Sequence, residues 1–138
     1  MLAAALRDWV ASLPPGTASL APVNAAQGGG FQVTPTREGA APIRLWVGAA
    51  PEYFTVQVGS SARWDQLPLV AGTVRKICTS VACGGFLEES WKLGSLTLAR
   101  RASLIVVGDA ALRWGTLSPF LPIPFARWVR RVPEPWLR

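Results

Sequence analysis

The first residues of the chain carry apolar side chains at the spacing of a helix. These positions are Leu2, Leu6, Trp9, Val10 and Leu13. Intervals of three and four residues place them along one stripe, which predicts a helix that packs by this stripe and ends before Pro14. Residues 16–30 are rich in Pro, Ala and Gly and show no period, so they predict a surface loop.

Apolar and polar residues then alternate in three short segments, as they do along strands that are buried on one side. The apolar positions are Phe31 and Val33, then Ile43, Leu45 and Val47, then Phe54, Val56 and Val58. Gly39 and Pro42 lie in the first connection and Pro51 lies in the second, as is typical of turns. Connections this short favour an antiparallel meander.

Residues 69–83 return to a helical period, with apolar residues on one side and mostly polar residues on the other. The adjacent Gly84 and Gly85 predict the end of this helix, because glycine adopts the left-handed conformation without a steric penalty. Three further strands are predicted over residues 86–93, 95–100 and 104–107, with turns at Gly94 and at Arg101-Ala102.

The predicted order is helix, three strands, helix, three strands. We therefore expect an α+β fold in which the helices pack on one face of an antiparallel sheet. The expected domain covers residues 1–117, and an extended tail rich in Pro, Trp and Arg covers residues 118–138. The dense prolines of this tail prevent a long helix. In the favoured hypothesis the tail docks on its own domain or on a partner and covers a sheet. In the two others it lies on a membrane surface or along a nucleic acid.

A short sequence similarity raises the hypothesis of two repeated halves, over residues 1–67 and 68–117. Val58-Gly59 is followed by Arg63-Trp64 and Leu67, and Val107-Gly108 is followed by Arg113-Trp114 and Leu117. The alternative is that two unrelated strands each end beside a tryptophan.

The composition supports a folded, single-domain protein. Of the 138 residues, 50% are hydrophobic and 16% are charged, the opposite of the composition of disordered chains. No apolar stretch is long enough to span a bilayer, and the start of the chain lacks the pattern of a signal peptide. We therefore expect a cytoplasmic protein. The two cysteines, Cys78 and Cys83, are poorly placed on one helix for a disulfide, in agreement with a reducing compartment.

Candidate catalytic chemistry is sparse. The chain contains no histidine, which removes the commonest general base and the commonest zinc ligand. The glycines at residues 28–30 precede a strand and lack the lysine of a phosphate-binding loop. Glu89 shares a strand face with Leu87 and Trp91, and we expect it to pair with Arg100 or Arg101 across the hairpin. These patterns indicate a non-catalytic protein with no cofactor and no metal.

The remaining signal is the combination of seven tryptophans with a net charge of +6. Arg44 and Trp46 share one strand face, and Tyr53 is expected on the same sheet face. The tail adds Arg127, Trp128, Arg130 and Arg131. Trp and Arg are enriched where protein interfaces bind tightly, and they also stack on bases. The alternative is that both faces of the sheet are covered within the chain.

The predicted order of helices and strands resembles, in topology alone, the small α+β chaperones and immunity-type adaptors of bacteria. Our first hypothesis is a protein-binding module that recognises an acidic partner or a second copy of itself through these aromatic and basic residues. The second hypothesis is nucleic-acid binding through the scattered arginines, and attachment of the tail to a membrane surface is a third.

Overall fold

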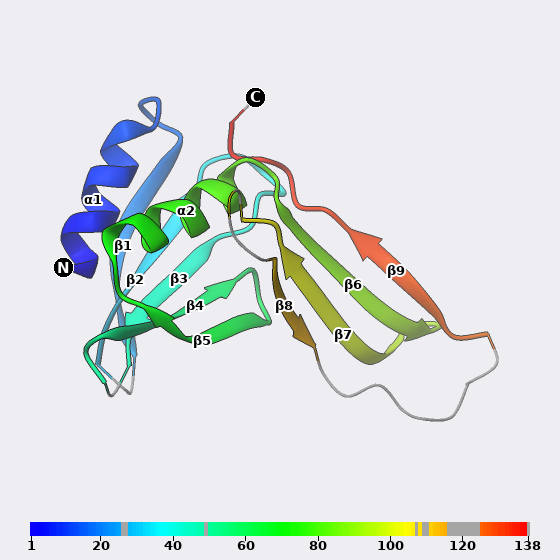
Figure 1. Ribbon diagram of the computed structural model, residues 1–138. Helices are drawn as coiled ribbons and strands as arrows, with labels where there is room; N and C mark the ends of the chain where they lie inside the picture. The colour runs from blue at the N-terminus through cyan, green and yellow to red at the C-terminus, as the bar shows by residue number, and fades with distance from the viewer. Residues whose placement is uncertain (26–27, 49, 107, 109–110, 116–124, 138) are drawn as a thin grey trace.

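The computed structural model describes residues 1–25, 28–48, 50–106, 108, 111–115 and 125–137. These residues form a mixed α+β structure with two helices and two antiparallel sheets (Figure 1). The elements are α1 (Leu2–Ser12), β1 (Ala18–Ala25), β2 (Gly28–Pro35), β3 (Ile43–Val47), β4 (Tyr53–Val58), β5 (Ala62–Pro68), α2 (Ala71–Ala82), β6 (Phe86–Leu93), β7 (Leu96–Leu104), β8 (Leu112–Gly115) and β9 (Arg127–Arg131).

The two helices lie where the periodic pattern predicts them. Leu2, Leu6 and Trp9 form the buried side of α1, and the Trp9 indole Nε1 donates a 3.0 Å hydrogen bond to Thr79 Oγ1 of α2. Helix α2 ends at Ala82, just before the predicted Gly84, which has φ 86°. The Gly84 and Gly85 amides donate to the carbonyls of Val81 and Ser80, a bonding pattern that closes a helix end.

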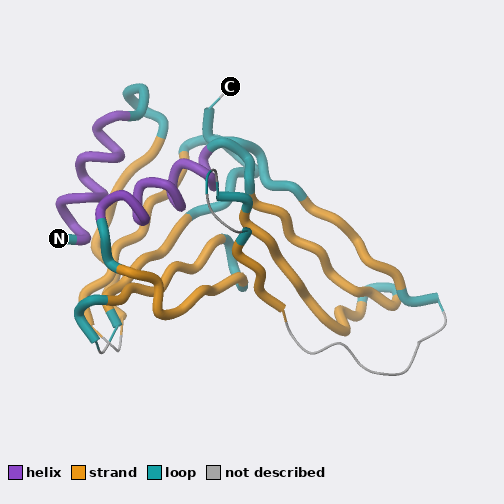
Figure 2. The backbone as a smooth tube through the Cα atoms, in the orientation of Figure 1, coloured by secondary structure: helices purple, strands orange, loops and turns teal. Residues whose placement is uncertain are grey.

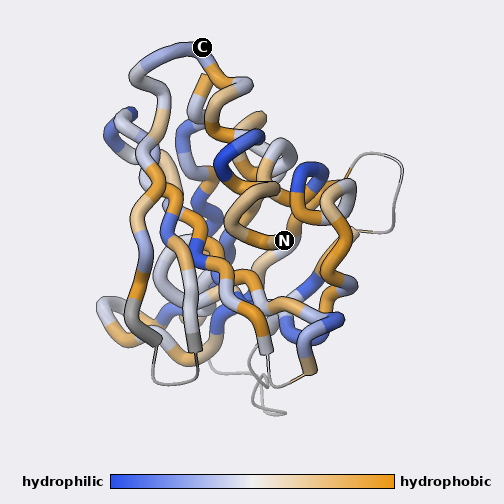
Figure 3. The backbone as a smooth tube through the Cα atoms, turned by 90° about the vertical axis from the view of Figure 1, so that its left-hand side faces the viewer, coloured by the Kyte–Doolittle hydropathy of each residue, from blue (hydrophilic) through white to orange (hydrophobic). Residues whose placement is uncertain are grey.

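The first sheet is an antiparallel meander in the order β1-β2-β3-β4-β5. Its inner face carries the alternating apolar residues, which form one core cluster with buried residues of both helices. Figures 1 and 2 show the two helices beside this sheet. Six of these side chains are fully buried: Val33, Ile43, Leu45, Phe54, Val56 and Val58. Removal of this apolar surface from water is the main stabilising contribution of the first sheet. Figure 3 shows how hydrophobic and hydrophilic residues are distributed along the strands.

The prediction of a surface loop over residues 16–30 is wrong, because strand β1 and the beginning of strand β2 occupy most of this segment. Strand β1 consists mostly of small residues and shows no regular alternation of apolar and polar side chains, and its extended conformation is stabilised by its pairing with β2. Strand β5 was not predicted either. A β-bulge opposite Thr55 interrupts the alternation of β5, so the sequence pattern does not show a continuous strand.

The second sheet has the order β8-β7-β6-β9, so the single sheet that the sequence predicts is replaced by two. Strand β6 has the predicted bounds. The turn predicted at Arg101-Ala102 is wrong, because both residues lie within the continuous strand β7 and pair with β6 on one side and β8 on the other. Helix α2 contacts β7 of the second sheet as well as α1, so the helices do not simply cover one sheet.

The end of the chain is bound to the body of the protein. Strand β9 pairs with β6 and completes the second sheet. Beyond it, the buried Trp136 packs against Trp9, with ring centroids 5.5 Å apart, and donates from Nε1 to the Ala41 carbonyl at 3.1 Å. Arg37 bonds to the Pro135 carbonyl. The predicted boundary between residues 117 and 118 lies outside the described residues, and the domain division stays a prediction.

The two sheets meet through the edge strands β5 and β8. At this junction Trp64 of β5 packs edge-on against Phe86 of β6. The two glycines of the repeat hypothesis occupy comparable positions in the fold. Gly59 and Gly108 both have positive φ, and they precede strands β5 and β8 respectively. Val107 and Leu117 lie outside the described residues, and the duplication stays a prediction.

Candidate binding surfaces

The face of the first sheet opposite its buried apolar side chains is called the outer face. Residues paired directly across antiparallel strands share a face. The register therefore places Gln32, Arg44, Gln57 and Arg63 in one row across four strands, and Gly30, Trp46 and Thr55 in the next. Tyr53, two residues before Thr55, lies on the same face, as the sequence predicts, and is 41% exposed.

Arginines hold the polar side chains of the outer face in place. Arg44 Nε donates a 2.8 Å hydrogen bond to Gln32 Oε1, and the Arg63 guanidinium lies 5.1 Å from the centre of the Trp46 ring. This separation is within the range of a cation–π interaction. A side chain at residue 30 would crowd Trp46, because a Cβ atom there would lie 3.1 Å from the Trp46 Cβ atom. Glycine at this position therefore leaves room for the indole.

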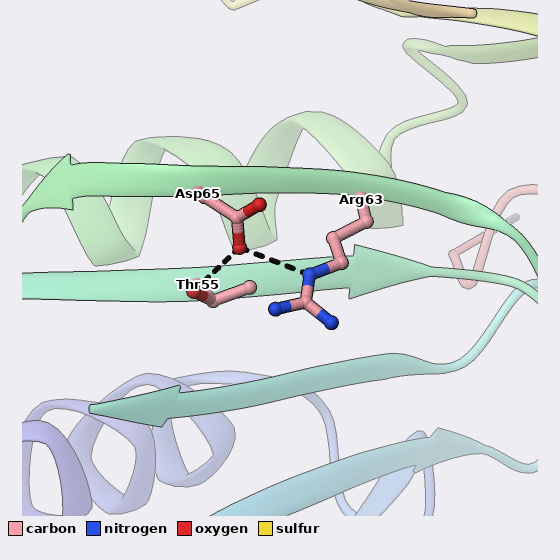
Figure 4. A network of polar contacts seen from close by, with 3 residues as sticks. All are labelled: Thr55, Arg63 and Asp65. Carbon is pink, nitrogen blue, oxygen red and sulfur yellow. Dashed lines mark hydrogen bonds and ion pairs between the residues drawn. The ribbon is translucent and has the colours of Figure 1, made fainter. Parts of the chain in front are cut away.

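The bulge in β5 brings a carboxylate onto the outer face. Asp65 Oδ1 accepts hydrogen bonds from Thr55 Oγ1 and Arg63 Nε, both at 2.9 Å (Figure 4). The Arg63 hydrogen bond, together with that from Thr55, lowers the pKa of Asp65. The sequence pattern does not indicate this cluster of Thr55, Arg63 and Asp65, although the spacing of Arg63 and Asp65 would have placed them on one face had β5 been predicted.

The second sheet carries a row of stacked side chains, which we call the Trp–Arg ladder: Glu89, Trp91, Arg101 and Trp128. The rings of Trp91 and Trp128 stack with centroids 6.2 Å apart and planes 22° apart. The Arg101 guanidinium lies 3.8 Å from the centre of the Trp128 ring. Arg101 Nε and Nη2 also donate to the two oxygens of Glu89, at 3.1 and 3.3 Å. A bidentate pair of this kind fixes the geometry of both side chains.

The ladder confirms the pairing predicted for Glu89 and selects Arg101 as its partner. The Arg101 hydrogen bonds, with the added positive charge of Arg130, lower the pKa of Glu89. A carboxylate with a lowered pKa stays ionised at neutral pH. Glu89 therefore acts here as the anion that holds Arg101 over Trp128.

The predicted site residues of β9 do not form one patch. Trp128 and Arg130 share a face with Trp91 and Glu89, their partners on β6. Arg127 and Arg131 lie on the opposite face, because side chains alternate along a strand. These residues are close together in the sequence, but the strand divides them between two surfaces.

One residue from each predicted group faces a common cleft. Arg44 of β3 and Arg131 of β9 both line a cleft of about 440 Å³ between the two sheets. Gln57, Ser60 and Glu88 also line it, and Ser61 Oγ lies 3.3 Å from Glu88 Oε1. The structure thus brings together two arginines that are far apart in the sequence.

Strand β6 differs from strands β3 and β4 of the first sheet, each of which contains at least two buried apolar residues. Phe86 is buried, but residues 87–92 are only half-buried on both faces of the strand. An inner strand of a folded domain normally buries at least one face completely. The second sheet therefore presents two partly exposed surfaces, each carrying arginine.

The remaining candidate chemistry is limited. Both cysteines are free: Cys78 is buried and Cys83 is exposed. Burial raises the pKa of the Cys78 thiol to about 12, which keeps it protonated and unreactive. Within the described ranges, no cluster of carboxylate and cysteine side chains is arranged to hold a metal ion. The same residues contain no helix that is long and apolar enough to cross a membrane.

Comparison with known proteins yields no relative. No protein-family model matches the sequence, and no curated protein and no solved structure matches this chain.

Proposed function

We propose that this chain is a small, non-catalytic protein-binding domain that recognises an acidic partner or a second copy of itself. The observation that carries the proposal is the second sheet, where residues 87–92 of its inner strand β6 are half-buried on both faces beside Arg130, Arg131 and Trp128. A partner that covered either face would bury this surface. Arginine and tryptophan supply large contact areas and planar hydrogen bonding, as in the energetically dominant parts of interfaces.

The arginine and tryptophan side chains of both sheets are already ordered by contacts with each other, which reduces the entropy lost when a partner binds. Arg63 lies over Trp46, and Arg101 is held between Glu89 and Trp128. Side chains that are already ordered lose less conformational freedom when a partner binds. The outer face around Arg44, Trp46 and Tyr53 and the surface around Arg127, Trp128, Arg130 and Arg131 are the two proposed contact regions.

The proposal is tested by affinity purification of the full-length protein from its own cells at low salt, with light scattering of the purified protein. We expect a stoichiometric protein partner or a dimer. The Trp46→Ala variant and the Arg130→Glu, Arg131→Glu double variant should lose the partner or the dimer. The exposed Arg7 of α1 provides the control, since Arg7→Glu changes the charge away from both contact regions. A monomer that retains no protein would contradict the proposal.

Nucleic-acid binding is the second proposal, and the cleft that contains Arg44 and Arg131 favours it. A nucleic-acid ligand would be released as salt is raised, because binding to phosphates releases counterions. Electrophoretic mobility shifts with duplex and single-stranded probes at increasing salt provide the test. The ring faces of Trp46 and Trp128 are already contacted by arginine, which favours protein contact over base stacking.

We place this activity in the cytoplasm, where free thiols such as Cys78 and Cys83 persist. Attachment of the tail to a membrane surface is the weakest proposal. The indole of Trp136 is buried and donates a hydrogen bond to the Ala41 carbonyl, so it is not free to enter a lipid interface. Flotation of the protein with anionic vesicles, compared with a chain truncated after Ser118, provides its test.

A further inference from the structure

The two edges of the second sheet differ in what lies beside them. Strand β8 forms one edge and contacts β5 of the first sheet. Strand β9 forms the other edge and pairs with β6 alone among the described strands. Figure 1 shows β9 on the outer side of the second sheet, away from the helices and the first sheet. An edge of this kind offers unpaired backbone groups to another extended chain.

The pairing pattern identifies which backbone groups face outward. The Ile105 amide donates to the Gly85 carbonyl at the beginning of the β6–β7 pair. Backbone bonding alternates along an antiparallel strand, so Glu88, Ser90 and Lys92 direct their backbone groups towards β9. Their partners Arg131, Val129 and Arg127 therefore use their backbone groups within the sheet. The amides and carbonyls of Trp128 and Arg130 point to the open edge.

The side chains of β9 make this edge strongly basic. Three of its five residues are arginines: Arg127, Arg130 and Arg131. The nearest acids on β6 are Glu88 and Glu89, and the Glu89 carboxylate already bonds to Arg101. A segment lying along β9 thus meets an excess of positive charge on both faces.

The positive charge of β9 disfavours pairing of this strand with β9 of a second molecule. Two β9 strands paired edge to edge would bring arginines of one copy beside arginines of the other. Like charges across neighbouring strands are destabilising, and natural edge strands use charge to prevent such pairing. An acidic segment has the opposite, favourable interaction.

We propose that the open edge of β9 binds an extended acidic segment of a partner protein, which joins the second sheet as an additional strand. The inference rests on the proposed protein-binding function and names its site and the chemistry of its partner. The backbone groups of Trp128 and Arg130 bond to the segment, and acidic side chains lie beside the three arginines. An apolar side chain lies beside Val129, which is 40% exposed. Strand addition of this kind draws affinity from the main chain and specificity from alternate side chains.

The test uses the full-length protein and a displayed library of random short peptides. We expect enrichment of peptides with several Asp or Glu residues and no proline. Arg130→Ala should weaken the selected peptide about tenfold, as expected for the loss of one charge-assisted hydrogen bond. Arg130→Pro should weaken it further, because proline also removes the outward amide. Arg7→Glu on α1 is the control and should bind as the unchanged protein does.

Amide hydrogen exchange of the unchanged protein gives a second measurement that does not depend on any variant folding. Binding of the selected peptide should slow exchange at Trp128 and Arg130, whereas Val129 is already paired with β6. Peptides that are not acidic, or that bind without protecting these two amides, would overturn the inference. So would a library that yields no binder.

Each of these negative results would contradict strand addition at β9 but not the proposed protein-binding function, which is tested separately. A partner recovered by affinity purification that is lost from the Trp46→Ala variant, but retained by Arg130→Pro, would show protein binding at the outer face instead of strand addition at β9. Absence of any partner or dimer would contradict the proposed function itself.

Discussion

The two sheets of this chain bury their side chains to different extents. In the first sheet Ile43, Leu45, Phe54, Val56 and Val58 have no exposed surface, and both helices contribute to the same core. In the second sheet Phe86 is buried, but the next six residues of β6 remain half-buried. The first sheet thus owes its stability mainly to apolar burial, whereas the centre of the second depends on cross-strand contacts such as Arg101 over Trp128.

This difference separates structural from binding roles within one small chain. Apolar burial stabilises strongly but leaves little surface for a partner. Cross-strand pairs between aromatic and charged residues contribute less to stability, yet they keep large side chains ordered at the surface. The second sheet has the features of a preorganised interface that is attached to a stable core.

The largest expected effect comes from the core of the first sheet. Phe54→Ala removes a fully buried aromatic ring and should lower the free energy of unfolding by about 3–5 kcal/mol. Urea denaturation followed by circular dichroism measures this change. The adjacent Tyr53, exposed on the opposite face, is the matched control, and Tyr53→Ala should cost less than about 1 kcal/mol. Equal losses in the two variants would contradict the proposed difference between the faces.

Trp136 connects the second sheet and the end of the chain to the core. Trp136→Ala should cost about 3 kcal/mol, because it removes a buried indole that packs on Trp9. Trp136→Phe keeps most of the packing but leaves the Ala41 carbonyl without its hydrogen bond, at a cost of about 1 kcal/mol. Limited trypsin digestion should cleave within β9 faster in the alanine variant. Unchanged cleavage would show that β9 is held by its pairing with β6 alone.

The Trp–Arg ladder should have a smaller effect on stability. Trp128→Ala removes both the stacking on Trp91 and the contact with Arg101, and should cost about 1–2 kcal/mol. A double-mutant cycle with Trp91→Ala isolates the stacking contribution, which we expect to be about 1 kcal/mol. Additive effects of the two variants would mean that the rings do not stabilise each other.

The smallest effect is the pH dependence of Glu89. Its pKa in the folded protein is lowered, chiefly by the Arg101 hydrogen bonds, below the value of about 4 expected in the unfolded chain. The pair therefore stabilises the protein above that unfolded pKa, and the stabilisation is lost as the pH falls through the lower folded pKa. Urea midpoints at neutral and acidic pH should change less in Glu89→Gln than in the unchanged protein. An identical pH dependence would show that Glu89 is not stabilised as an anion.

Sequence periodicity predicted the elements whose side chains alternate or recur regularly. Both helices, the strands over residues 43–47 and 86–93, and the pairing of Glu89 with an arginine follow from this pattern. The candidate site was predicted in part. The sequence indicated Arg44, Trp46 and Tyr53 on one face, but it did not indicate the Thr55–Arg63–Asp65 cluster, because the bulge in β5 disrupts the alternation.

The sequence by itself determined which segments are helical and that the regularly spaced apolar residues of the helices and of strands β3 and β4 enter the core. These properties depend on local periodicity and on the side chains themselves. The tertiary structure alone decided that β1 is a strand, that the strands form two sheets and that β9 pairs with β6 across 34 or more intervening residues. Edge strands are stabilised by backbone pairing with distant residues, and backbone groups are the same in every sequence, so the residues of β1 and β9 carry little local signal of their partners.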